Sequence, residues 1–227
     1  MLLALAAPAG AWAAADGTAA ATAGPSLHPG PSLHPGTAHA PVILVFGDSL
    51  SAGYGVPVGA GWVSLLARKI AQADYDFSVV NASVSGETTA GGLARLPRAL
   101  DLHHPRILIL ELGANDGLRG LPIASARSNL DQMITLAQAR GVQVLLLGLR
   151  MPPNYGPRYT SAFHRMYLDL AHDHHLALVP FLLKKVALHP QLIQADGLHP
   201  NALGQPLLLQ MVWPQLAPML RAKAPTG

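Results

Sequence analysis

The sequence contains no cysteine, and it is poor in charged residues, which make up 12% of its 227 residues against 50% for hydrophobic residues. The absence of cysteine excludes disulfide bonds, metal sites built on thiolates and a lipid anchor attached to cysteine. The net charge is +3, and the longest basic runs are the pairs Arg68-Lys69 and Lys184-Lys185. A nucleic-acid-binding protein usually carries a basic cluster or stripe. We therefore expect a globular protein that does not bind nucleic acid.

The N-terminal segment also lacks positive charge, because the first Lys or Arg of the chain is Arg68. Residues 1–15 form an apolar stretch that ends in Ala-x-Ala patterns, as signal peptides do, and this stretch is too short to cross a bilayer. A signal peptide begins with positive charge, so this interpretation requires an n-region that is truncated or lies upstream; a disordered, alanine-rich tail is the alternative. We expect a signal peptide over 1–15, which predicts a periplasmic or secreted protein with no stable membrane insertion after the signal is removed.

Residues 16–40 are rich in Ala, Gly, Pro, Ser and Thr, and the hexapeptide Gly-Pro-Ser-Leu-His-Pro occurs there twice in tandem, at 24–29 and 30–35. Frequent proline and glycine disfavour helix and strand, so we expect this segment to be a linker of extended or irregular backbone. One folded domain is expected over residues 41–222, followed by a short tail over 223–227.

From Pro41 onward, short apolar segments alternate with longer segments in which apolar residues recur with a helical period. Parallel strands need crossover connections, so this alternation predicts an α/β fold. We expect a three-layer α/β/α sandwich of flavodoxin type, with about five parallel strands and helices on both faces. The expected strands are 42–46, 77–81, 107–112, 142–147 and 176–179. The expected helices are 62–73, 89–102, 123–139, 161–174, a short one over 181–187, and 202–220, in which Pro206, Pro214 and Pro218 should bend or break the helix.

Polar residues follow the expected strands directly, at the edge where open parallel sheets bind ligands. Ser49 follows the first strand, Gly86 the second and Asn115 the third, while Asp196 and His199 come after the fifth strand and a short helix. Serine becomes a nucleophile when a histidine takes its proton and a carboxylate orients that histidine. Backbone N–H groups and a side-chain amide can stabilise the oxyanion that forms. We therefore predict acyl transfer, with Ser49, Asp196 and His199 as catalytic residues and an oxyanion hole made by Ser49, Gly86 and Asn115.

These segments resemble the SGNH hydrolases, also called the GDSL-type family, which are named for the Ser, Gly, Asn and His of their sequence blocks. The resemblance rests on Gly47-Asp-Ser-Leu50, Gly86, Gly113-Ala-Asn-Asp116 and Asp196-Gly-Leu-His199 in that order, and it covers residues 42–220. It implies a serine hydrolase that needs no cofactor. The neighbouring segments are similar to those of family members that act on acyl-CoA thioesters, lysophospholipids and aryl esters. An acyl groove is expected beside the serine, lined by Leu118, Leu121, Leu149, Met151 and Tyr155.

Each of these residues also has a plainer interpretation. Ser49 lies where serine often caps a helix, and Gly86, Asn115 and Asp116 are typical turn or cap residues. The run His172-Asp-His-His175 has the composition of a metal cluster, but no third-ligand spacing supports such a site. We expect solvated histidines there, and no metal.

Two other functions are compatible with these residues: removal of acetyl groups from glycans by the same chemistry, and a binding module that has lost activity. The apolar residues expected at the groove favour an acyl chain over a sugar, and no sequence block is missing. Arg119 and Arg150 are candidates for contact with an anionic head group, with solvated arginines as the alternative. We expect a monomer that acts on a small-molecule acyl ester or thioester.

Overall fold

The computed structural model describes residues 40–221, which form a five-stranded parallel sheet in the order β2-β1-β3-β4-β5. The expected signal peptide, nearly all of the expected linker and the expected tail lie outside these residues. This strand order is that of flavodoxin-type folds, so the predicted fold class is confirmed. The strands are β1 (Val42–Gly47), β2 (Ser78–Asn81), β3 (Pro105–Glu111), β4 (Gln143–Leu147) and β5 (Ala177–Val179).

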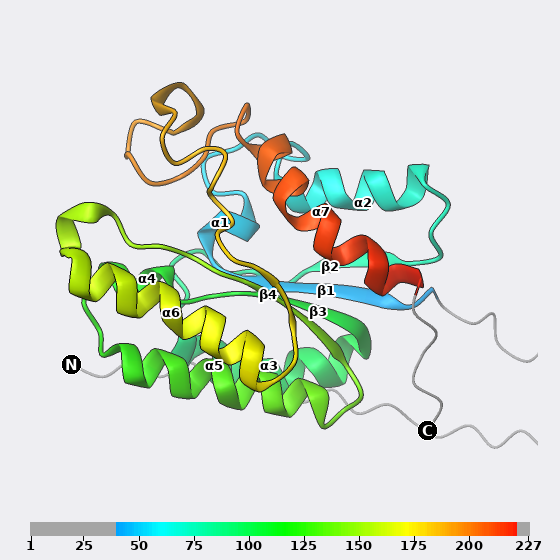
Figure 1. The fold of residues 1–227 in the computed structure, drawn as a ribbon. Helices are drawn as coiled ribbons and strands as arrows, with labels where there is room; N and C mark the ends of the chain where they lie inside the picture. The colour runs from blue at the N-terminus through cyan, green and yellow to red at the C-terminus, as the bar shows by residue number, and fades with distance from the viewer. Residues whose placement is uncertain (1–39, 222–227) are drawn as a thin grey trace, which may run out of the picture. The chain divides into compact units, whose positions relative to one another are not determined.

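Helices cover both faces of the sheet (Figure 1). One face carries α2 (Trp62–Gln72) and α7 (Gln205–Arg221), and the other carries α3 (Thr89–His103), α5 (Ile123–Gln138) and α6 (Pro157–Asp173). The short helices α1 (Ser49–Ala52) and α4 (Ala114–Leu118) and the 3-10 turns Pro153–Tyr155 and Pro190–Leu192 complete the chain. Within residues 40–221, no helix is long and apolar enough to cross a membrane.

The hydrophobic core lies on both sides of the two central strands. Residues 43–46 of β1 and 107–110 of β3 are completely buried, as expected for parallel strands covered by helices on both faces. Each covering helix adds an apolar stripe; in α2 this stripe consists of Trp62, Val63, Leu66 and Ile70. The outer strands β2 and β5 are only partly buried.

The helix expected over 181–187 does not form, and the segment is a series of turns. Its hydrogen bonds are scattered, from Lys184 N–H to Phe181 and from Ala187 N–H to Leu183. A segment this short forms a helix poorly by itself, and the complete burial of Leu182 and Val186 fixes its path instead.

Of the two expected effects of the prolines, a bend or a break, the break does not occur, and α7 runs without interruption past Pro214 and Pro218. Pro206 lies in the first turn, where the N–H that proline lacks has no helical partner. The hydrogen bonds lost at the inner prolines are offset by packing, because α7 buries a stripe with a spacing of four residues: Leu208, Val212, Leu216 and Leu220.

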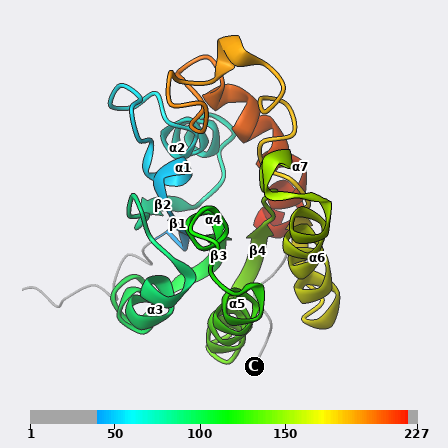
Figure 2. The ribbon, with the colours of Figure 1, turned by 90° about the vertical axis from the view of Figure 1, so that its left-hand side faces the viewer.

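The carboxyl ends of the strands meet at one edge of the sheet, which Figure 2 views directly. The helices α1 and α4 begin there, immediately after β1 and β3. The sequence segments that were singled out after these strands are therefore neighbours in space.

Candidate active site

Ser49 is held at the first position of α1 by the residues around it. The Asp48 carboxylate caps this helix by accepting the Leu50 N–H at 3.0 Å. Glycine is required at position 47, because a Cβ there would lie 2.7 Å from Glu111 Oε2. This close approach between β1 and β3 lets the chain turn sharply and present Ser49 at the groove above the sheet.

The three predicted catalytic residues form one chain of hydrogen bonds. Ser49 Oγ lies 2.8 Å from His199 Nε2, and His199 Nδ1 lies 2.6 Å from Asp196 Oδ2. The other Asp196 oxygen accepts the backbone N–H groups of Leu198 at 2.9 Å and of His199 at 3.0 Å. The Tyr54 ring packs against the imidazole, with 4.8 Å between the ring centres. The imidazole is thus fixed between the hydroxyl and the carboxylate.

Asp196 carries its charge throughout the neutral range. Desolvation raises the pKa of Asp196, but the hydrogen bonds from Leu198 and His199 outweigh this effect and lower the pKa from 3.8 to about 2. With Asp196 ionised and 2.6 Å from Nδ1, the His199 proton belongs on Nδ1, and Nε2 is free to accept the Ser49 proton.

Gly86 and Asn115 lie on the same groove as Ser49. Asn115 is set at the start of α4 by Gly113, whose φ of 119° is disfavoured for residues with a side chain. The Asn115 amide nitrogen donates to the Glu87 carbonyl at 2.9 Å and to Asp48 Oδ2 at the longer distance of 3.2 Å. The predicted oxyanion-hole residues are therefore brought together, and the Asn115 amide is oriented by two protein acceptors.

Asp116, for which a turn or cap role was expected, bonds to the first residue of another helix. It is 3% exposed, and its carboxylate accepts both the backbone N–H of Thr89 at 2.8 Å and the Thr89 hydroxyl at 2.6 Å. Thr89 is the first residue of α3. Asp116 therefore links α4, which carries Asn115, to the start of the helix that follows Gly86.

Two carboxyl groups, those of Asp48 and Glu111, are completely buried beside the turn of residues 47–50 that carries Ser49, here called the nucleophile turn. Glu111 ends β3 beside Asp48, and both side chains are 0% exposed. Glu111 Oε2 accepts from the Ser51 hydroxyl at 2.8 Å and from the Asp48 N–H at 3.3 Å. Desolvation by burial is the main cause that raises the pKa of Asp48 from 3.8 to about 6, and it raises the pKa of Glu111 well above 4.5, with the Asp48 charge adding to the effect. The sequence places both carboxyl groups beside strand ends, but it does not show that they lie against each other and are buried.

The groove beside Ser49 has a volume of about 1100 Å³. Leu118, Leu149 and Met151 line it as predicted, whereas Leu121 and Tyr155 do not. Tyr155 instead lies behind the wall, where its hydroxyl donates to the Leu118 carbonyl at 3.0 Å. Sequence reasoning missed the part of the wall that follows β5, which includes Leu183, Ile193 and Leu198. The rule that located the other residues, reading past the end of each strand, would have pointed to Leu183.

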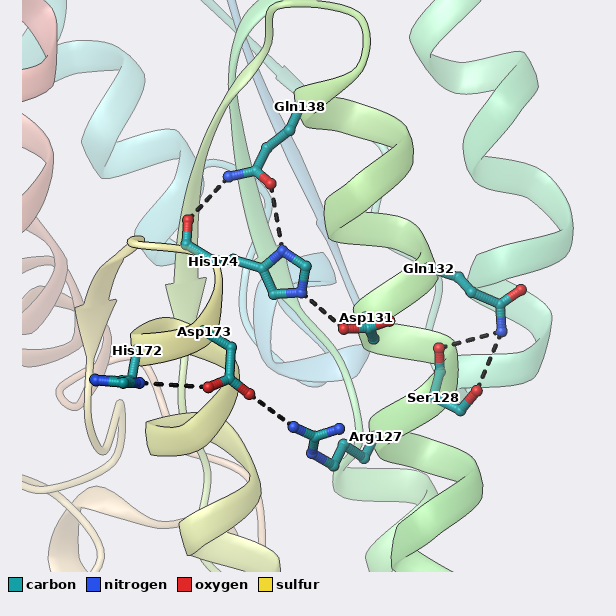
Figure 3. Close-up of polar contacts among 8 residues, drawn as sticks. All are labelled: Arg127, Ser128, Asp131, Gln132, Gln138, His172, Asp173 and His174. Atoms are coloured by element: carbon teal, nitrogen blue, oxygen red, sulfur yellow. Dashed lines mark hydrogen bonds and ion pairs between the residues drawn. The ribbon is translucent and has the colours of Figure 1, made fainter.

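The histidines near the end of α6 do not form a metal cluster (Figure 3), and among residues 40–221 no three His, Cys, Asp or Glu residues are grouped to hold a metal ion. The expectation of solvated side chains fits His172, which is 88% exposed, but is wrong for His174, which is 17% exposed. His174 Nε2 lies 2.7 Å from Asp131 of α5, and Gln138 contacts both the ring and the backbone of His174.

The chain is similar to known proteins over most of its length. Residues 45–207 match the GDSL-like Lipase/Acylhydrolase family. The chain is 51% identical to the esterase TesA of Pseudomonas aeruginosa, covering 81% of this chain and 91% of the relative. It is 43% identical to thioesterase 1/protease 1/lysophospholipase L1 of Escherichia coli, covering 81% of this chain and 86% of the relative.

The chain is similar to a solved structure as well. The psychrotrophic esterase EstA of Pseudoalteromonas sp., in a structure inhibited by monoethylphosphonate, superposes with a TM-score of 0.76 at 38% identity and covers 80% of this chain and 99% of that chain. Because the matched residues contain the nucleophile turn, the Gly86 and Asn115 loops and the Asp196–His199 pair, the chain belongs to the GDSL-like lipase/acylhydrolase family.

Proposed function

We propose that the protein is a serine hydrolase that cleaves acyl esters and thioesters through an acyl-enzyme on Ser49. The observation that carries this proposal is the continuous chain of hydrogen bonds from Ser49 through His199 to Asp196. The names of the relatives, esterase TesA and thioesterase 1/protease 1/lysophospholipase L1, support the same reaction class.

In this mechanism Ser49 Oγ attacks the carbonyl carbon of the substrate while His199 Nε2 accepts the hydroxyl proton. The tetrahedral intermediate then expels the alcohol or thiol, which receives that proton from His199. Water attacks the acyl-enzyme with His199 again as the base, and the carboxylic acid leaves as Ser49 is restored. Asp196 stays ionised and stabilises the imidazolium that forms in each half of the reaction.

The backbone N–H groups of Ser49 and Gly86 and the Asn115 amide form the proposed oxyanion hole. Both amide protons of Asn115 already face protein acceptors, and the contact to Asp48 is the longer one, at 3.2 Å. The amide N–H that faces Asp48 would therefore donate to the developing oxyanion in place of Asp48, while the other N–H keeps its hydrogen bond to the Glu87 carbonyl. Hydrogen bonds of this kind are often long before the transition state and tighten in it.

The shape and lining of the groove favour an acyl chain as the substrate group beside Ser49. Leu118, Leu149 and Met151 give the groove an apolar wall, and a sugar would leave its hydroxyls without partners on such a wall. A groove of about 1100 Å³ is also far larger than an acetyl group requires. These features argue against the glycan deacetylase that the sequence alone allowed.

The test is turnover and covalent labelling. The wild-type protein should hydrolyse p-nitrophenyl decanoate and react with a fluorophosphonate probe. Ser49→Ala should abolish both, whereas Ser125→Ala, an exposed serine on α5, should change neither. Labelling that survives in Ser49→Ala would refute the assignment, and turnover restricted to p-nitrophenyl acetate would favour the deacetylase.

We further propose that the protein is exported to the periplasm or the medium and acts there as a monomer. The support for export is the apolar segment over residues 1–15 with its Ala-x-Ala patterns. Fractionation of cells that express the chain with its own upstream region, followed by N-terminal sequencing, tests this point. Uncleaved protein in the cytosol would contradict it.

A further inference from the structure

The groove carries positive charge at one end and no acidic residue along its length. The side chains of Arg150, Arg165 and Lys184 line it together with His164, and no Asp or Glu is among the lining residues. In the described part of the chain, none of these three cations lies in an ion pair with a carboxylate. Their charge is therefore uncompensated where the groove faces solvent.

Arg150 is positioned although it has no acidic partner. Its Nη2 lies 3.0 Å from His164 Nε2 on α6, and the guanidinium lies over the Phe181 ring, 5.4 Å from its centre. Burial and the Arg150 charge lower the pKa of His164 below 6.5, against a smaller opposing effect of the Leu149 backbone. A neutral His164 accepts a hydrogen bond from Arg150 and leaves its charge intact. The guanidinium is thus held in place with its remaining N–H groups free to bind.

The strand order determines how far this cationic end lies from the nucleophile. Ser49 follows β1, Arg150 follows β4 and Lys184 follows β5, and β4 and β5 are the second and third strands away from β1. With about 4.8 Å between neighbouring strands, the cations lie roughly 10–15 Å along the sheet edge from Ser49. The apolar residues Leu149, Met151 and Leu183, which neighbour these cations in the sequence, line the same groove.

We propose that the Arg150 end of the groove binds an anionic group, a carboxylate or a phosphate, which the substrate carries at a distance from its scissile carbonyl. This inference rests on the proposed function and specifies its substrate class. The planar guanidinium is suited to both anions, because it can donate two parallel hydrogen bonds to either of them. The anion belongs either to the far end of the acyl chain or to the leaving group, and the chemistry of recognition is the same.

Two substrate pairs test the inference and separate these two sources. The first pair is p-nitrophenyl decanoate and the mono-p-nitrophenyl ester of decanedioic acid, which differ by a terminal carboxylate on the acyl chain. The second pair is S-decanoyl-pantetheine and S-decanoyl-4′-phosphopantetheine, which differ by one phosphate on the leaving group. For each pair, the ratio of kcat/KM for the anionic substrate to that for the neutral one is measured. Each ratio is then measured again at increasing NaCl concentration.

Arg150→Gln should lower this ratio by about five- to tenfold for one of the two pairs, mainly through KM, because it removes one charge-assisted contact at a partly screened site. Arg150→Lys should retain much of the ratio. The matched control is Arg140→Gln, which removes the same charge just before the opposite end of β4 and should leave both ratios unchanged. Added salt should lower the wild-type ratio of the same pair.

The outcomes separate this inference from the proposed function. If the wild-type protein hydrolyses none of the four substrates, the proposed function fails. If it hydrolyses them and Arg150→Gln changes neither ratio, the reaction class stands and the anionic subsite is refuted.

Discussion

At the scale of single residues, the amide of Asn115 is oriented before any substrate arrives, by the Glu87 carbonyl and by Asp48. Donors that are fixed in advance contribute most where negative charge develops, which is in the transition state. Asn115→Ala should therefore lower kcat on p-nitrophenyl decanoate by on the order of 10²–10³ and change KM much less. Steady-state kinetics, together with a thermal melt to show that the variant is folded, measure this.

The control for this prediction must lie away from the site. Asp116 is the neighbouring polar residue in the sequence, but in the structure it holds the start of α3 through Thr89, so its replacement would disturb the position of Asn115 as well. Asn154 is an exposed asparagine outside the groove, and Asn154→Ala should leave kcat unchanged. Equal losses of kcat in Asn115→Ala and Asn154→Ala would show that Asn115 does not donate to the oxyanion.

Residue positions were predictable from the sequence where strand ends determine them. Ser49, Gly86 and Asn115 follow directly after strands, so the topology alone places them at one edge of the sheet. Leu121 lies ten residues past the end of β3, and Tyr155 lies eight residues past the end of β4. Which side of the wall such residues face depends on the path of short loops, and apolar character alone does not determine it. Thus Tyr155 supports Leu118 from behind and does not line the groove.

At the scale of elements, side chains spread along α5 make polar contacts with the C-terminal end of α6 (Figure 3). The His174 ring lies between Asp131 at 2.7 Å and Gln138 at 3.3 Å, and the Gln138 amide donates to the His174 carbonyl at 3.0 Å. Nearby, Arg127 pairs with Asp173 at 2.8 Å. These contacts link the two helices near the start of β5, at the amino edge of the sheet and away from Ser49.

His174→Ala should therefore destabilise the protein without affecting catalysis. The ring is 17% exposed and bonded at both nitrogens, so its loss should lower the free energy of unfolding by about 1–2 kcal/mol. His172→Ala is the matched control, because this side chain is 88% exposed and contacts Asp173 only at 3.3 Å; its effect should stay within about 0.5 kcal/mol. Urea unfolding of both variants measures the difference. A similar loss in the two variants would show that His174 does not link the helices.

Elements were predictable where an apolar period extends over several turns. The long helices and all five strands lie within a few residues of their expected positions because burial of one face determines them. The segment 181–187 is too short for its apolar period to be informative. A series of turns can bury Leu182 and Val186 as well as a helix can. The polar link between α5 and α6 was not predictable, because it joins His174 to residues of another helix.

At the scale of the whole molecule, the sheet brings together every part of the proposed site along one edge, and the side chains of Asp48 and Glu111 are completely buried there. In the folded state the pKa of Asp48 is about 6, against 3.8 for an unperturbed Asp, because burial disfavours the charged form of the carboxyl group. For a carboxyl group shifted in this direction, the folded state binds the proton more tightly than the unfolded state. The stability contributed by the protonated form is then lost as pH rises between these two values.

The free energy of unfolding should therefore contain a contribution from Asp48 that falls by about 1–1.5 kcal/mol between pH 5 and pH 8. Asp48→Asn removes the ionisation and should flatten the pH dependence by this amount, as urea unfolding at pH 5, 6, 7 and 8 would measure. The pKa of Glu111 is raised well above 4.5, chiefly by burial, so Glu111 contributes a decline of the same sign and Glu111→Gln should also flatten the pH dependence. The control is Asp169→Asn, which changes an exposed carboxyl group on α6 and should leave the pH dependence close to that of the wild type. The Asp196 carboxylate does not interfere, because its pKa of about 2 places its ionisation below this pH window. If Asp48→Asn retained the full wild-type slope, Asp48 would have to be ionised at pH 5 in the folded protein despite its burial, and the decline would have to come from another group.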